Sequence, residues 1–205
     1  MHTLQPVVCN RLSPHANSES DDARVIAASI AAPQEFTVIF ERHFDEIHRY
    51  LRRRHPGEAE ELAAEVFTVA FDARARYQPL ADSARPWLYG IASRLLARRR
   101  RSETRALRAH GRSGGRRELA PDEFAAAVER ADAERQSALI AAAVAELNQG
   151  DRDVLLLYAL GGLSYDEVAL ALELPIGTVR SRLARARRQC GEQLAALAGK
   201  EGSRQ

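Results

Sequence analysis

Apolar residues recur every three or four positions over much of this chain, which is the spacing of one face of an α-helix. The first such run predicts a helix from about residue 36, and it ends where His55, Pro56 and Gly57 break the pattern. A second run, reaching about residue 75, predicts another helix with Glu61 and Glu65 away from its apolar side. The apolar positions of the two helices are Phe36, Ile39, Phe40, Phe44, Ile47, Leu51, Leu62, Val66, Val69 and Ala70.

Further helical segments follow along the chain. A loop over residues 77–86 precedes a third helix, which begins near Pro86 and runs through an arginine-rich block. Residues 121–147 are alanine-rich with a helical pattern, and residues 151–160 predict one more helix. A glycine-rich run at residues 111–115 predicts a flexible linker between the two halves. The core face of the third helix holds Leu88, Ile91, Ala92 and Leu95, and the opposite face holds Gly90, Ser93, Arg94, Ala97 and Arg101.

The most informative pattern lies in residues 163–190. Ser164 and Glu167 have the spacing of a capping box, in which each side chain accepts a hydrogen bond from the other residue's backbone N–H. Pro175 cannot continue the first helix but suits the start of a second. At about 100° per residue, one stripe of the second helix is apolar and the opposite face is basic. The stripe holds Val179, Leu183, Ala186 and Cys190, and the opposite face holds Arg180, Ser181, Ala184, Arg185 and Arg188.

This pair of helices is typical of a helix-turn-helix and indicates DNA binding. Arginine suits the outward face because it makes bidentate contacts with guanine and salt-dependent contacts with phosphate. Arg182 and Arg187 lie on the flanks of that face, where we expect phosphate contacts. The alternative is a solvated basic face on an ordinary helical hairpin. The agreement of cap, turn and amphipathic face favours the DNA-binding interpretation.

Composition supports a helical protein. Of the 205 residues 45% are apolar and 6% aromatic, and Ala, Leu and Arg dominate, which favours helices over strands. We predict an all-α protein with two small helical domains joined by a flexible linker. The expected boundaries are a disordered N-terminal tail at residues 1–33, a first domain at 34–104, a linker at 105–134, a second domain at 135–198 and a C-terminal tail at 199–205.

The net charge of +2 conceals a strong segregation of charge along the chain. Between Arg85 and Arg117 there are eleven arginines and a single acid, Glu103. Acidic residues concentrate instead at residues 58–65 and 122–134. Such blocks predict two kinds of partner surface, one for a polyanion and one for a different partner.

Little in the sequence supports an enzyme, a metal site or a cofactor. His43, His48 and His55 are spaced by five and seven residues, whereas metal ligands on one helix face are spaced by four. No nucleophile–base motif or glycine-rich phosphate loop is present. Cys9 and Cys190 form no metal-binding or redox pattern, and we expect the Cys190 thiol to be buried. Neither a signal peptide nor an apolar run of about 20 residues is found, so a cytoplasmic protein is expected.

Three stretches carry a resemblance to a known family. The run GLSYDEVALALELPIGTVRSRLARAR resembles region 4.2 of sigma factors of the extracytoplasmic-function group. Upstream, FTVIFERHFDEIHRYLRRR and EAEELAAEVFTVAFDARARY resemble regions 2.1 and 2.2, and RPWLYGIASRLLARRRR resembles regions 2.3 and 2.4. The resemblance covers residues 36–101 and 139–194, with nothing similar to region 3 between them, which is the order of this group.

The resemblance implies a promoter-specificity subunit that binds core RNA polymerase and helps to open a promoter. Its contacts with the polymerase would be the clamp helices of the largest subunit and the flap. The clamp would contact the helix at residues 60–73, at the matching positions Glu61, Glu65 and Phe67. The loop at residues 78–85 and the following helix would melt and read the −10 element, with Arg85, Trp87, Tyr89, Ser93, Arg94, Arg98 and Arg101 as candidates. The second helix of the helix-turn-helix would read the −35 element, with Thr178, Arg180, Ser181, Ala184, Arg185 and Arg188 as candidates.

Some of these roles have alternatives within the first domain. Trp87 and Tyr89 could stack on unpaired bases or pack in the core or an interface. The arginines at residues 98–101 could hold the DNA backbone or form a solvated charge run. The chain also departs from the family pattern: Gly90 and Arg94 stand where a basic residue and an asparagine are usual, Ala64 where a glutamine is frequent, and Ala184 where a larger side chain is frequent.

A second function class is a stand-alone regulator that uses only the helix-turn-helix. Such proteins usually dimerise on paired half-sites, and this chain has no evident leucine-rich dimer seam. The acidic residues 58–65 would also have no role in such a regulator. The resemblance further implies an anti-sigma factor as a partner, although nothing in the sequence identifies one.

Overall fold

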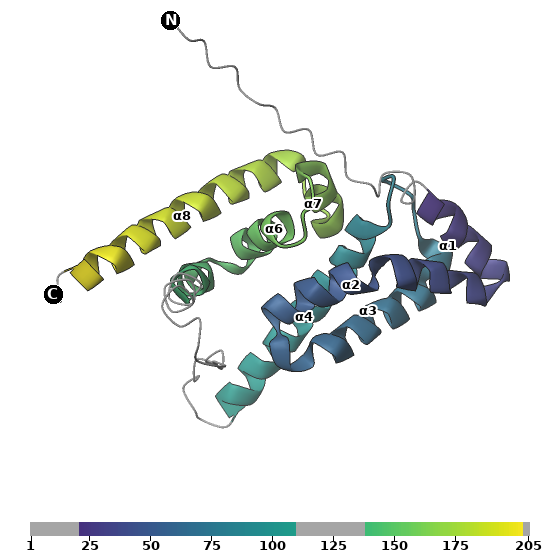
Figure 1. Cartoon of the computed structure of the whole chain (residues 1–205), viewed down its shortest axis with the longest axis horizontal. Coiled ribbons are helices and arrows are strands. Elements are labelled where there is room, and N and C mark those ends of the chain that lie inside the picture. Colours follow the sequence, from purple (N-terminus) through teal and green to yellow (C-terminus); the bar gives the residue numbers. More distant parts are fainter. Residues whose placement is uncertain (1–20, 110–137, 203–205) are drawn as a thin grey trace, which may run out of the picture.

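The computed structural model of the chain describes residues 21–109 and 138–202, and every regular element in these ranges is a helix (Figure 1). This confirms the predicted all-α class. The first domain contains α1 (Asp22–Ala31), α2 (Thr37–Arg54), α3 (Ala59–Ala73) and α4 (Arg85–Ala109), with the short 3₁₀ turns η2 (Pro33–Phe36), η3 (Pro56–Glu58) and η4 (Arg74–Arg76) between them. The second domain contains helical residues 138–146, α6 (Gln149–Ala159), α7 (Tyr165–Leu172) and α8 (Ile176–Gly202).

The core of the first domain forms where α2, α3 and α4 pack on one another. Most of the apolar positions predicted from periodicity are buried there, including Ile39, Ile47, Leu62 and Leu88, each with no exposed surface. Phe44 is half-buried, and Phe40 and Val69 are exposed, with 40% and 37% of their surface accessible. The helical period thus identifies the packed faces of α2 and α3, and it overestimates their width.

Residues 21–33 differ from the prediction. The sequence predicts a disordered tail over residues 1–33, and for residues 22–31 this is wrong because they form α1; residues 1–20 lie outside the described residues. Ile26 is 1% exposed, and Asp22 is completely buried. An isolated helix of this length is marginal in water, so its stability comes from packing against the rest of the domain. Periodicity along so short a segment does not reveal that packing.

The helix-turn-helix of the second domain forms as predicted. The Ser164 backbone N–H donates to the Glu167 carboxylate at 2.7 Å, and the Glu167 N–H donates to the Ser164 hydroxyl at 3.2 Å. Glu173 ends α7 in the left-handed region, with φ of 54°. The predicted stripe on α8 is buried at Val179, Leu183 and Ala186, but Cys190 is only half-buried because it lies near the end of the packed part of the helix.

Two helices extend past the predicted ends of their domains. The helix α4 continues to Ala109, past the predicted domain end at residue 104, and α8 continues to Gly202, past the predicted end at residue 198. The remainder of the predicted linker, as well as residues 135–137, lies outside the described residues. In the described part of the chain, no helix is long and apolar enough to cross a membrane.

The two domains also pack against each other, which the sequence does not predict. In Figure 1 the second domain, green to yellow, lies along one side of the first, purple to teal, and α7 packs directly on α4. Gly90 of α4 permits this approach, because a Cβ atom at residue 90 would lie only 2.7 Å from the Ala171 carbonyl oxygen. Arg54 of α2 and Asp153 of α6 add a largely buried ion pair at 2.8 Å.

Candidate nucleic-acid interface

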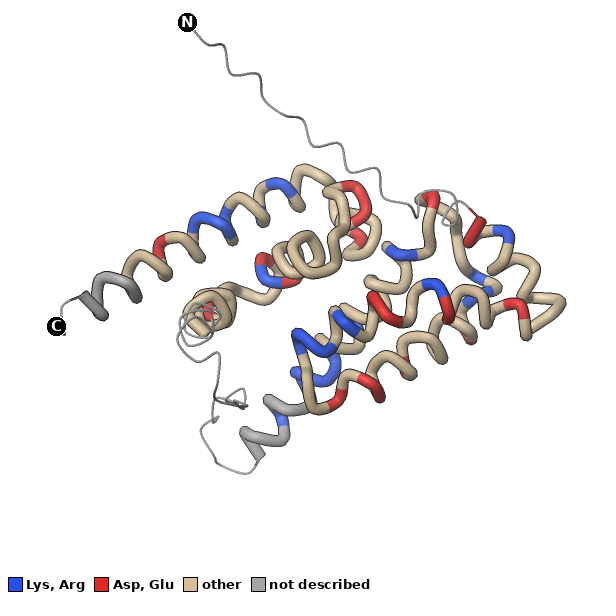
Figure 2. The backbone as a smooth tube through the Cα atoms, viewed as in Figure 1, with Lys and Arg blue, Asp and Glu red and all other residues tan. Residues whose placement is uncertain are grey.

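The outward face of α8 brings most of the candidate −35 residues together. Figure 2 shows basic residues recurring along this helix. Thr178, near the start of α8, is half-buried. The opposite face is the buried stripe that packs in the second domain, so the outward face is accessible to a ligand. The candidate residues exposed on it are Arg180, Ser181, Ala184, Arg185 and Arg188.

Among the candidate −35 residues, Arg185 has a side chain that is held by a residue of another helix, Asp151 of α6. Its Nη1 atom lies 3.4 Å from both carboxylate oxygens of Asp151, which is completely buried at the start of α6. The Asn148 amide donates to the same carboxylate at 2.7 Å and fixes its position. About half of the Arg185 side chain, 48%, remains exposed. Its other N–H groups can therefore face a base edge or a phosphate.

The candidate −10 residues are separated by the fold into buried and exposed groups. Tyr89 is 1% exposed and packs edge-on against the Tyr50 ring, with centroids 5.0 Å apart. Burial raises the pKa of its hydroxyl well above the ordinary value. Of the two alternatives for this residue, the structure supports core packing.

The face of α4 predicted to be outward is covered in part. Gly90 and Ser93 are both buried, and α7 of the second domain packs over Gly90, where Ala171 lies. Arg94, on the same face, is 58% exposed and pairs with Glu173 at 3.0 Å. Arg85 contacts both the Glu46 carboxylate, at 3.0 Å, and the Gly161 carbonyl of the second domain, at 2.8 Å. Among the other candidates, Arg98 and Arg101 are exposed.

Trp87 and the preceding loop form a pocket of about 410 Å³. The half-buried Trp87 ring lies 4.7 Å from the Tyr77 ring, at an angle of 48°. Leu80 of the loop is 68% exposed, and Arg94 lines the pocket from α4. Leu170 of α7 and Glu173, directly after α7, also line the pocket. The sequence interpretation missed Tyr77 and Leu80, although an aromatic residue at the start of a predicted DNA-melting loop is a usable signal.

The candidate polymerase-binding residues lie on α3. Arg99 of α4 lies 2.8 Å from Glu61 and 3.9 Å from Glu65 of α3, and 3.4 Å from Glu58 at the end of η3. Glu61 remains 68% exposed and Glu65 36% exposed. Phe67 is only 5% exposed, since it packs against Phe40 with ring centroids 5.0 Å apart. Phe67 therefore lies in the core, and only the carboxylates face outward.

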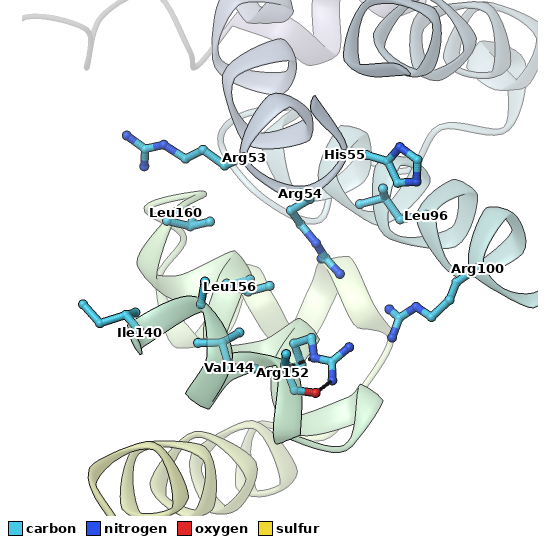
Figure 3. Close-up of a pocket in the computed structure, with 12 residues that line it drawn as sticks. Arg53, Arg54, His55, Leu96, Arg100, Ile140, Val144, Arg152, Leu156 and Leu160 are labelled. Carbon is cyan, nitrogen blue, oxygen red and sulfur yellow. Dashed lines mark hydrogen bonds between the residues drawn. The ribbon is translucent and has the colours of Figure 1, made fainter. Parts of the chain in front are cut away.

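A cavity of about 500 Å³ lies between the two domains. Figure 3 shows Arg54 and Arg100 extending from the first domain toward apolar side chains of the second, among them Leu156. Arg152 closes the end of helical residues 138–146 by donating to the carbonyls of Val144, at 3.0 Å, and Leu147, at 2.7 Å. The cavity has an apolar floor and a basic rim. Within the described residues, no cluster of His, Cys, Asp or Glu is placed to hold a metal ion.

Two protein families match the chain. Sigma-70 region 2 matches residues 39–106, and Sigma-70 region 4 matches residues 137–190. The ECF RNA polymerase sigma factor SigC of Mycobacterium tuberculosis is 31% identical over 169 residues, which cover 81% of each chain. The RNA polymerase sigma-H factor of Pseudomonas aeruginosa is 30% identical over 146 residues, which cover 68% of this chain and 75% of that protein.

Solved structures share the fold. CnrH, in a complex with the cytosolic domain of CnrY, has a TM-score of 0.60 at 22% identity and covers 85% of this chain and 97% of its own. The sigma factor RpoE of Bartonella quintana, in a complex with the anti-sigma factor NepR, has a TM-score of 0.61 at 18% identity and covers 79% of this chain and 98% of its own. Together with the arginine face of α8 and the region 2 and region 4 matches, these likenesses show that the chain belongs to the extracytoplasmic-function sigma factors of RNA polymerase.

Proposed function

This sigma factor directs promoter-specific transcription initiation by RNA polymerase, and we propose that its helices α8, α4 and α3 each contact a different part of the promoter or the polymerase. The observation that carries the proposal is the outward face of α8, where Arg180, Ser181, Ala184 and Arg185 are exposed together on the second helix of a helix-turn-helix. A helix of this kind places its exposed side chains against base edges in the major groove. We assign this face to the −35 element, with Arg188 and Thr178 at its borders.

The loop pocket and α4 are assigned to the −10 element. Trp87 and Tyr77 form an aromatic wall, and Arg94 adds a positive charge beside it. A single-stranded base held out of its stack needs such a pocket with a basic margin. Arg98 and Arg101 follow along the exposed side of α4, where they can hold the adjacent phosphates. Because α7 covers Gly90, that position reaches DNA only when α7 moves away from α4.

The exposed carboxylates of α3, Glu61 and Glu65, are assigned to the clamp helices of the largest polymerase subunit. Arg99 holds both side chains in place and lowers the local negative charge. Phe67 supports the same surface from inside the core by fixing α3 against α2. The second domain is expected to contact the polymerase flap.

An anti-sigma factor is the proposed regulatory partner. The likeness to CnrH and RpoE supports this, since both were solved in complexes with a protein partner, and the partner of RpoE is named as an anti-sigma factor. A segment seated in the cavity between the domains would contact both and hold them together. The chain itself contributes binding energy, and phosphodiester formation belongs to the polymerase. We place its action in the cytoplasm, where promoter DNA and polymerase are found.

The first experiment mixes the purified chain with sigma-free core RNA polymerase on a sizing column and then measures run-off transcription from genomic fragments. Co-elution and transcription from a subset of fragments are the expected results. Glu65→Arg should weaken co-elution, because it replaces a carboxylate that faces the clamp with a cation that also repels Arg99. Glu60→Arg, on another side of α3, is the matched control. Retained binding to specific duplex DNA without co-elution would favour a stand-alone regulator instead.

A further inference from the structure

Asp22 is a buried acid in α1 that the proposed function does not use. Its carboxylate is completely buried and accepts hydrogen bonds from His43 Nε2 at 2.8 Å and Arg42 Nη1 at 2.9 Å. It also accepts from the Ser83 hydroxyl at 3.2 Å and from the Ala84 backbone N–H at 2.9 Å. A buried carboxylate is stable only when donors satisfy it. Here those donors come from α2 and from the end of the loop that precedes α4.

The two loop contacts fix the start of α4. Ala84 is the residue before the helix, and its carbonyl accepts from the Leu88 N–H at 3.0 Å. The Ser83 hydroxyl accepts from the Arg85 N–H at 3.2 Å. The first turn of a helix has unpaired N–H groups and a partial positive charge, which an anion stabilises. Asp22 supplies that anion from a different helix, 62 residues earlier in the chain.

The same contacts reach the walls of the loop pocket. Ser83 lines the pocket directly, and Trp87 follows it by one helical turn. At the other end of the loop, Tyr77 packs on Trp87, and burial together with the charge of Asp22 raises the pKa of the Tyr77 hydroxyl to about 12. Moving Ser83 and Ala84 would therefore move the first turn of α4, and with it the Trp87 ring.

The carboxylate is itself held by a second layer of polar groups. His43 Nδ1 lies 3.0 Å from the Glu46 carboxylate, which in turn lies 3.0 Å from Arg85 Nε. These contacts fix the His43 ring between two acids and leave Asp22 one orientation. The network links α1, α2 and the start of α4 without contacting α3, where we place polymerase binding.

We propose that Asp22 is a positioning residue for promoter opening: by anchoring Ser83 and Ala84, it sets the geometry of the pocket that holds an unpaired −10 base. This rests on the proposed −10 role of the loop and α4. It makes α1 part of the DNA-opening apparatus, although the matched region 2 segment begins only at residue 39.

The test uses holoenzyme formed from the full chain and core polymerase, on a promoter that the unsubstituted holoenzyme opens. Permanganate reactivity of unpaired −10 thymines measures opening, and anisotropy titrations measure core and −35 duplex affinity. In Asp22→Ala we expect opening to fall about tenfold through loss of the charge-assisted hydrogen bonds to the loop, with both affinities within about twofold. Asp22→Asn, which keeps an acceptor oxygen, should recover part of the opening.

Ile26→Ala is the matched control. Ile26 lies one turn further along α1 and is 1% exposed, so its truncation removes apolar packing of α1 and none of the hydrogen bonds from the loop to Asp22. Compared at equal folded fraction, we expect it to open the promoter as the unsubstituted chain does. An equal defect in Ile26→Ala, or a proportional loss of core affinity in Asp22→Ala, would reduce Asp22 to a stabilising residue and overturn the proposal. If the unsubstituted holoenzyme opened no promoter, the proposed function would fail first, and this proposal with it.

Discussion

At the scale of single residues, His43 couples the stability of the first domain to pH. Burial on its own would lower the pKa of His43, but hydrogen bonds and charges from Asp22 and Glu46 raise it from 6.5 to about 9. For the Asp22 carboxyl, burial alone would raise the pKa, but the hydrogen bonds from His43, Ala84 and Arg42 lower it. Asp22 is therefore ionised throughout the range in which His43 titrates.

The folded state thus holds the His43 proton more tightly than the unfolded chain does. This stabilisation is fully present below about pH 6.5 and is lost as the pH rises through about 9. Urea unfolding should show a free energy of unfolding that falls by up to about 3 kcal/mol over that window. His43→Gln should remove most of this slope, and His48→Gln, also in α2, should retain it. A slope that survives His43→Gln would contradict the assignment.

Arg185 poses a second question at the residue scale, namely whether it reads a base or holds a phosphate. Because Asp151 orients its guanidinium and 48% of the side chain is exposed, we expect a base contact. Arg185→Ala should then cost about 1–3 kcal/mol on the preferred −35 duplex and relax the choice at one base pair. Arg188→Ala should weaken all duplexes alike. Binding titrations against a set of substituted −35 duplexes measure both, and a uniform loss for Arg185→Ala would identify a phosphate contact.

At the scale of helices, the capping box of α7 stabilises the first helix of the helix-turn-helix, against which α8 packs. Ser164→Ala removes the acceptor for the Glu167 N–H, so the free energy of unfolding should fall by about 1 kcal/mol. Ser164→Thr keeps a hydroxyl acceptor and should stay close to the original value. Urea unfolding followed by circular dichroism measures the difference. An equal loss in both variants would mean that the side-chain cap is not the source of stability.

The capping box also shows which helical features can be predicted from sequence. Its two residues are three positions apart, so the sequence alone specifies the contact. The apolar stripe of α8 can likewise be found from the helical spacing of neighbouring residues. The position of α1 cannot be found this way, because Asp22 is held by residues up to 62 positions away. Similarly, periodicity identifies one packed face of α4, and the burial of Gly90 on its other face depends on a second domain.

At the scale of the whole molecule, the two domains pack on each other in part through contacts between α4 and α7. The Arg94–Glu173 pair is exposed, at 58% and 80%, and exposed pairs contribute little. The Arg54–Asp153 pair is largely buried, with 6% and 14% exposed, but it lies on α2 and α6. Because the exposed pair contributes little, the close approach at Gly90 is the feature of the α4–α7 contact whose removal should have the larger effect.

Gly90→Arg introduces a Cβ atom 2.7 Å from the Ala171 carbonyl oxygen, closer than any normal contact, and places a long charged side chain where α7 now lies. The usual family residue at this position is basic, so the substitution also tests whether this chain's glycine permits the closed packing. We expect the domains to separate, with a larger radius of gyration in small-angle X-ray scattering. Gly191→Arg adds the same charge within α8, where nothing lies within 4 Å of a Cβ atom, and should leave the radius unchanged. An unchanged radius in Gly90→Arg would instead mean that α7 shifts locally while Arg54 and Asp153 keep the domains together.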